Sequence, residues 1–263
     1  MVIILQSLIV YRYMVFIVFV LGLCVGSFLN VLIDRLPKGE QVLRGRSKCD
    51  YCKKTLRWFE LIPLLSFVMQ HGTCLRCHKK LSIQYPLIEF ITGLGFVWIY
   101  LSFDYSLIGL FAYWIIFSSL LVIFVSDLKY QIIPDSMVVA GIIGTLLLFF
   151  SSKPYALNPM HFLLTAILSS TLFFLLWLVT KGKSMGFGDV KLAFLLGLLL
   201  GYPKIIVALY SAFLTGAIFG VILILKGKRT LKSKIAFGPF LIVGALIAFL
   251  WSDTILLWWK TLL

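Results

Sequence analysis

The stretch that decides the fold is "YWIIFSSLLVIFVS" (residues 113–126), which carries no charge and runs directly into "DLKYQIIPD" (residues 127–135). Together with the apolar residues from 107 onward, it is long enough to cross a bilayer as a helix of about 20 residues. The whole chain shares this character, since 61% of its 263 residues are hydrophobic and only 13% are charged. A soluble domain of this length cannot bury so much apolar surface. The sequence therefore predicts a membrane protein.

Similar apolar stretches recur along the chain. They are continuous rather than alternating, which favours helices over a β-barrel. The candidate spans are residues 10–33, 86–103, 107–126, 134–150, 160–180, 186–201, 203–225 and 236–258. The expected fold is an all-α polytopic membrane protein with about eight transmembrane helices and one long polar loop at residues 36–85.

The basic residues predict the orientation of these spans. The net charge is +14, and 20 of the 24 Lys and Arg residues lie in, or flank, the loops after the first, third, fifth and seventh spans. Such a bias places those loops in the cytoplasm and both termini outside. Basic loops between apolar spans are typical of contact with anionic lipid headgroups. We therefore expect the lipid bilayer as a partner and no nucleic acid.

The polar loop contains two paired cysteines, Cys49-x2-Cys52 and Cys74-x2-Cys77, separated by 21 residues. Each pair brings two thiolates to one tight turn, and two such turns form a tetrahedral four-sulfur site suited to structural zinc. Disulfides or inert thiols are the alternatives, and a cytoplasmic position disfavours disulfides. His71 and His78 are possible substitute ligands, but four cysteines already complete the site.

Three aspartates fall near the predicted cytoplasmic ends of spans. Asp127 follows the apolar run at a helix C-terminus, where the helix dipole disfavours a negative charge, so its position indicates function. Asp135 follows Pro134 in a standard helix start. Asp189 completes "GFGD", in which Gly186 and Gly188 allow a sharp bend or a close backbone approach.

Two carboxylates that face each other in a partly dry site share a proton and hold a water between them. One then acts as general base and the other as general acid on an amide bond. This is the chemistry of aspartyl proteases. The alternative for Asp189 is a structural role as a helix cap at the membrane surface.

Several motifs together resemble the type IV prepilin peptidases. "SDLKYQIIPD" and, 62 positions after its first aspartate, "GFGD" resemble the two aspartate motifs of that family. "GSFLNVLIDRLP" (residues 26–37), the two cysteine pairs, "LIPLLSF" (61–67) and "YPLIE" (85–89) are similar to its amino-terminal methyltransferase module. "FGPFL" (237–241) resembles its last span. The short length and Lys-rich loops are similar to competence-type members of Gram-positive bacteria.

The resemblance implies a bifunctional enzyme of the bacterial cytoplasmic membrane. It would cleave the basic leader of prepilins or pseudopilins after a glycine at the cytoplasmic face, and then N-methylate the new terminus with S-adenosylmethionine. Asp127 and Asp189 would be the catalytic pair, with Asp135, Gly186 and Gly188 in support. Residues 1–103 would form the methyltransferase-type module and residues 104–263 the peptidase domain.

The residues themselves show less of the methyltransferase half, because no glycine-rich cofactor motif is visible. Asn30, Arg35 and Glu60 are candidate cofactor-binding residues, although Asn30 and Arg35 also suit polar anchors at a helix end. Glu60 and Glu89 are candidates for contact with the basic leader.

Other functional classes are also compatible with parts of the sequence. A proton-coupled transporter could use an aspartate pair, but it would place the pair near the bilayer midplane and show inverted repeats. A GxGD intramembrane protease without methyltransferase activity would lack the cysteine loop. A non-catalytic assembly factor would leave the two aspartates unexplained.

Overall fold

The computed structural model describes residues 2–42, 45–49, 51–102, 106–151, 158–182, 185–226 and 236–262. The described residues form helices and loops, with only isolated β-bridges in the polar loop. The chain divides into two compact units, Met1–Leu110 and Phe111–Leu263.

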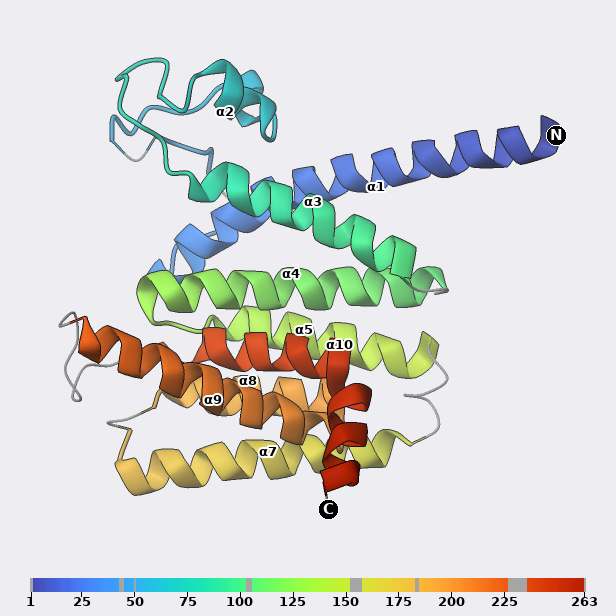
Figure 1. Ribbon diagram of the computed structural model, residues 1–263. Helices are drawn as coiled ribbons and strands as arrows, with labels where there is room; N and C mark the ends of the chain where they lie inside the picture. Colours follow the sequence, from blue (N-terminus) through green and yellow to red (C-terminus); the bar gives the residue numbers. More distant parts are fainter. Residues whose placement is uncertain are drawn as a thin grey trace. The chain divides into compact units, whose positions relative to one another are not determined.

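The first unit is built from two long helices joined by the polar loop (Figure 1). The elements are α1 (Val2–Arg35), the 3-10 turns η1 (Leu36–Lys38) and η2 (Trp58–Leu61), α2 (Leu65–Met69) and α3 (Gln84–Ser102). Glycines let α1 and α3 approach closely. A Cβ added to Gly22 would lie 2.7 Å from the Cα of Gly93, and one added to Gly26 would lie 2.7 Å from the Cα of Glu89.

The second unit is a bundle of six described helices (Figure 1). They are α4 (Leu107–Tyr130), α5 (Asp135–Ser151), α7 (Pro159–Thr180), α8 (Phe187–Leu200), α9 (Lys204–Leu225) and α10 (Gly238–Leu262). The turn between α4 and α5 is tight because Gln131 adopts the left-handed conformation (φ 55°) and donates its N–H to the carbonyl of Asp127 at 2.9 Å.

Helix α8 lies at the centre of the second unit. Ten of its fourteen residues are buried, and it contacts α5, α7, α9 and α10. Ser169 of α7 donates a hydrogen bond to the carbonyl of Ala193 at 2.9 Å, and Gly197 brings α8 against the backbone of Ala166. A helix of fourteen residues spans about 21 Å, less than a hydrocarbon core of about 30 Å. Helix α8 is thus shorter than the hydrocarbon core, and most of its surface is covered by the neighbouring helices.

The prediction of an all-α polytopic membrane protein is confirmed. Six of the described helices are long and apolar enough to cross a membrane: Tyr11–Lys38, Gln84–Ser102, Leu107–Tyr130, Pro159–Thr180, Lys204–Leu225 and Gly238–Trp258. The remaining two predicted spans are also helical, but α5 and α8 are shorter than the others. The count of eight is thus approximate.

Candidate functional site

Asp127 lies in the last turn of α4 and is only 5% exposed. Its Oδ2 accepts a hydrogen bond from the backbone N–H of Gly238, the first residue of α10, at 2.9 Å. A Cβ at Gly238 would lie 2.6 Å from that oxygen, so only a glycine fits here without movement. The start of α10 therefore fixes the Asp127 carboxylate with a backbone donor.

Asp189 lies in the first turn of α8 and is 6% exposed. Its Oδ2 accepts a hydrogen bond from the N–H of Gly186 at 3.2 Å, while its own N–H donates to the carbonyl of Gly186 at 3.2 Å. The carboxylate thus does cap the helix, as the structural alternative expected. A carboxylate there also benefits from the positive end of the helix dipole.

The two carboxylates belong to one site. They interact electrostatically, and Ile133 lies beside the backbone that holds each of them. Added Cβ atoms at Gly188 and Gly238 would come within 2.9 Å and 3.3 Å of the Ile133 side chain, respectively. Among the described residues, no further hydrogen bond is made by the second oxygen of either carboxylate.

Asp135, the third predicted residue, takes a different position. It accepts two hydrogen bonds from the Nζ of Lys191, at 2.7 and 2.8 Å. This ion pair joins the first turn of α5 to the first turn of α8. Asp135 is well exposed, unlike the buried Asp127 and Asp189. Its contact is suited to positioning the N-terminus of α8.

The two cysteine pairs of the first unit have the same local backbone structure. The N–H of Cys49 donates to the carbonyl of Lys54 at 3.0 Å, and the N–H of Cys74 donates to the carbonyl of Lys79 at 3.0 Å. An isolated antiparallel bridge flanks each pair. The loop therefore contains two equivalent knuckles.

His78 has a conformational role in its knuckle. It adopts φ 55° directly after Cys77, just as Lys53 adopts φ 57° directly after Cys52. The metal-binding cluster found among the described residues contains the four cysteines and no histidine. The expectation that four cysteines complete the site fits this arrangement.

The four sulfur atoms fit a tetrahedral metal ion. Sulfurs bound to zinc at about 2.3 Å lie about 3.8 Å from one another. Here the Cys49 and Cys77 sulfurs are 3.9 Å apart, and all four lie within 4.8 Å of one another. Backbone N–H groups of Arg76 and Cys77 donate toward the Cys74 sulfur, which lowers the pKa of this thiol to about 7. Burial, in contrast, raises the pKa of the Cys49 thiol to about 11, so the two thiols differ in how readily they lose a proton.

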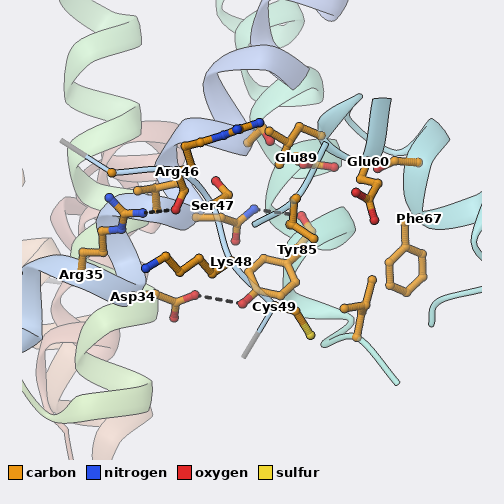
Figure 2. Close-up of a pocket in the computed structure, with 18 of the residues that line it drawn as sticks. Asp34, Arg35, Arg46, Ser47, Lys48, Cys49, Glu60, Phe67, Tyr85 and Glu89 are labelled. Carbon is orange, nitrogen blue, oxygen red and sulfur yellow. Dashed lines mark hydrogen bonds between the residues drawn. The ribbon is translucent and has the colours of Figure 1, made fainter. Parts of the chain in front are cut away.

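A cavity of about 500 Å³ lies between the polar loop, including the Cys49 knuckle, the C-terminal end of α1 and the N-terminal end of α3 (Figure 2). Its size is within the range of small-molecule sites. Asn30, Arg35 and Glu60, the three predicted cofactor-binding candidates, all line it. The structure therefore brings these residues together around one cavity.

Hydrogen bonds show how the lining residues are held. Asn30 donates from Nδ2 to the carbonyls of Gly26 and Tyr85, at 3.3 and 3.1 Å. Arg35 donates to the carbonyls of Gln41 and Arg46, at 3.1 and 3.3 Å. Both residues therefore also act as polar anchors at the C-terminal end of α1, the alternative role considered for them from the sequence.

Sequence reasoning assigned no role to Gly238 or Lys191. Gly238 lies in the quoted "FGPFL", but its contact with Asp127 joins residues 111 positions apart. The one local signal is a glycine directly before a proline at the start of a span. Lys191 follows "GFGD" by two positions and was counted only as a basic flanking residue.

Comparison with known families finds two matching profiles. The profile described as Bacterial Peptidase A24 N-terminal domain matches residues 20–103. The profile described as Type IV leader peptidase family matches residues 114–221. The first range contains the cysteines and the cavity, and the second contains Asp127 and Asp189.

Similar full-length proteins carry the name "Prepilin leader peptidase/N-methyltransferase". The protein of Bacillus subtilis (strain 168) is 30% identical over 246 residues, covering 92% of this chain and 96% of its own length. That of Legionella pneumophila is 31% identical over 278 residues and 94% of each chain. That of Myxococcus xanthus is 34% identical over 216 residues, covering 80% of this chain and 63% of its own length. No solved structure gives a significant match.

We expect the purified protein to contain one zinc ion per chain, bound by the four cysteines. Replacing Cys77 with serine removes one ligand and should reduce the bound metal to a small fraction, measured by inductively coupled plasma mass spectrometry. Cys24→Ser is the matched control, because Cys24 lies on α1 outside the cluster and should leave the metal content unchanged. Full metal content in Cys77→Ser would contradict the assignment.

Proposed function

This chain belongs to the type IV leader peptidase family, and from that premise we propose that it is a prepilin leader peptidase and N-methyltransferase of a bacterial cytoplasmic membrane. The enzyme cleaves the leader of type IV prepilins or pseudopilins and methylates the new N-terminus. The observation that carries the peptidase half is that Asp127, near the end of α4, and Asp189, near the start of α8, are both buried and interact electrostatically.

Asp127 and Asp189 are the catalytic pair of this proposal. Two carboxylates in a partly dry site share one proton, because both cannot ionise comfortably. The ionised one accepts a proton from the attacking water, and the protonated one donates a proton to the leaving amine. Gly238 and Gly186 hold one oxygen of each carboxylate, which leaves the other oxygens for the water and the scissile amide.

The neighbouring residues have supporting roles. Gly188 keeps the backbone beside Asp189 close to Ile133, where a side chain would collide. Gly186 caps α8 and orients the Asp189 carboxylate. Asp135 pairs with Lys191 and fixes the same end of α8 against α5. These contacts support precise placement of the pair, on which aspartyl catalysis depends.

The orientation of the enzyme follows from its charges. The 20-to-4 distribution of Lys and Arg supports a cytoplasmic cysteine loop, a cytoplasmic aspartate site and both termini outside. A substrate with an apolar helix would then enter from the bilayer while its basic leader stays in the cytoplasm.

Methyl transfer belongs to the first unit in this proposal, with the cavity as the cofactor site. S-adenosylmethionine, when bound, supplies an activated methyl group on a sulfonium ion. Asn30 and Arg35 suit its polar and carboxylate groups, and Glu60 suits its positive charge. A zinc ion in the four-cysteine site would hold the knuckle that forms one wall, since Cys49 itself lines the cavity. A closed site of this kind stabilises a fold and leaves no open position for chemistry.

Leader cleavage tests the peptidase proposal. We expect Asp127→Asn and Asp189→Asn each to abolish processing of a co-expressed prepilin, because either change removes one of the two proton-transfer groups. The size of the prepilin on a gel, and the mass of its mature N-terminus, measure cleavage and methylation separately. A shortened prepilin in cells that contain only one of these variants would rule out the aspartate pair.

Gly238→Ala gives a graded version of the same test. The new Cβ would displace the Asp127 carboxylate, so we expect cleavage to slow by about 10- to 100-fold while the protein stays folded. Gly216→Ala in α9 is the matched control, since its Cβ would meet its nearest neighbour only at 3.4 Å. The measurement is the initial rate of leader cleavage by each variant, and the melting temperature of each variant checks that it is folded. Equal rates in the two variants would show that the Gly238 contact is unimportant.

A further inference from the structure

Two carboxylates of the cavity are buried. Glu60 of η2 is 8% exposed and Glu89 of α3 is 7% exposed, and both line the cavity. Neither forms an ion pair with any described Lys, Arg or His. A buried carboxylate without a counter-ion is costly unless a cationic ligand approaches it. The part of the cavity beside these two carboxylates is therefore suited to a positively charged group.

Backbone N–H groups directly before η2 and directly before α2 hold the two carboxylates. Oε2 of Glu60 accepts the N–H of Arg57 at 2.6 Å, and Oε2 of Glu89 accepts the N–H of Leu64 at 2.8 Å. Leu64 has the left-handed φ of 57°, an uncommon conformation for a residue with a branched side chain. The backbone of Leu64 thus adopts an uncommon conformation, and its N–H holds the Glu89 carboxylate beside the cavity.

Acidic and basic side chains both line the cavity. Figure 2 shows Glu60 and Glu89 on one side, and Arg35 and Lys48 together with the acidic Asp34 on the other. Neither glutamate belongs to the four-cysteine cluster, so neither carboxylate serves as a metal ligand there. The two glutamates therefore form the part of the lining that suits a cationic group.

The proposed reaction brings two cations to this site, the sulfonium of the methyl donor and the α-ammonium of the cleaved substrate. Glu60 lies on the polar loop, whereas Glu89 lies in the second turn of α3, a helix apolar enough to span the membrane. The substrate amine arrives on an apolar helix, so Glu89 is the carboxylate on its side. We propose that Glu89 binds the α-ammonium of the newly cleaved substrate and accepts its proton before methylation.

The proton transfer is needed because an ammonium has no lone pair. An α-amine has a pKa of about 7.7–8.0 and is mostly protonated at neutral pH. Glu89 takes one proton from it, the nitrogen lone pair then forms the new N–C bond, and the proton on Glu89 passes to water. In the donor the S–C bond breaks and its electron pair stays on sulfur, so total charge is conserved. This role for Glu89 rests on the proposed N-methyltransferase function.

Binding tests the inference without the methyl donor. The probes are two synthetic peptides of about 20 apolar residues that begin with phenylalanine, one with a free α-amine and one N-acetylated. Wild-type protein in nanodiscs should bind the free amine about 10- to 100-fold more tightly, as expected for a charge-assisted hydrogen bond. Glu89→Gln should lose this preference. A preference that persists in Glu89→Gln would overturn the proposal.

Asp253→Asn is the matched control, because Asp253 is an exposed carboxylate of α10 that does not line the cavity. It should keep the wild-type preference for the free amine. Equal losses in Asp253→Asn and Glu89→Gln would show a general effect of negative charge and overturn the specific role. Full metal content and an unchanged melting temperature establish that Glu89→Gln is folded, and Glu89→Asp should recover part of the preference.

Methyl transfer gives a second readout. A general base contributes about 10²- to 10⁴-fold, so Glu89→Gln should slow transfer by at least the lower figure at pH 6.5. The deficit should shrink as the pH rises toward 9, because more of the amine is already neutral. The other charged groups that line the cavity are Asp34 and Arg35 of α1, Lys38 of η1, and Glu40, Arg46, Lys48, Lys53 and Glu60 of the polar loop and η2. Glu89→Gln leaves these groups in place. A change with pH in the ratio of the wild-type to the Glu89→Gln methyl-transfer rate therefore reports on Glu89.

The outcomes separate this inference from the function on which it rests. Wild-type protein that transfers no methyl group to the free-amine peptide would refute the proposed N-methyltransferase activity. If wild type and Glu89→Gln transfer methyl groups at the same rate at every pH, only the role of Glu89 is refuted. A deficit that stays constant with pH would also refute it, since a purely structural defect has that result.

Discussion

A carboxylate that is kept away from water must find hydrogen-bond donors within the protein. The second unit meets this constraint with backbone N–H groups at the starts of two helices. Gly238 of α10 donates to Asp127, and Gly186 of α8 donates to Asp189. Such donors carry no charge and occupy little space, so they stabilise the carboxylates without neutralising them. An Arg or Lys in the same place would hold both groups permanently ionised.

The packing of the second unit follows from the same requirement. Helix α8 is short and largely buried, and its burial begins at Asp189 in the first turn. Ile133 fills the space between the backbone of Gly188 and that of Gly238. The ion pair of Asp135 and Lys191 lies outside this buried region and joins α5 to α8. The proposed peptidase site is thus a set of helix ends brought together by small residues. In the first unit, the carboxylates of Glu60 and Glu89 likewise accept hydrogen bonds from backbone N–H groups.

The sequence predicted those features that depend on local pattern. Uninterrupted apolar stretches predicted the helices, and the spacing of four cysteines predicted a cluster that the structure forms. The family resemblance, carried by the two aspartate motifs and the amino-terminal motifs, is confirmed by the family and full-length comparisons. The catalytic roles of Asp127 and Asp189 stay a prediction, although both residues are buried and interact. Contacts such as Gly238 with Asp127, or Leu64 with Glu89, join segments far apart in the chain, and no local pattern encodes them.

The dependence of leader cleavage on pH tests the central claim most directly. If Asp127 and Asp189 share one proton, kcat/KM should follow a bell-shaped curve whose two macroscopic ionisations belong to the pair. Purified wild-type enzyme and a synthetic prepilin substrate, measured from about pH 4 to pH 9 in the presence of a weak chelator, give this curve. Loss of the whole curve in both Asp127→Asn and Asp189→Asn agrees with the account. A single ionisation, or a curve that survives either substitution, would contradict it.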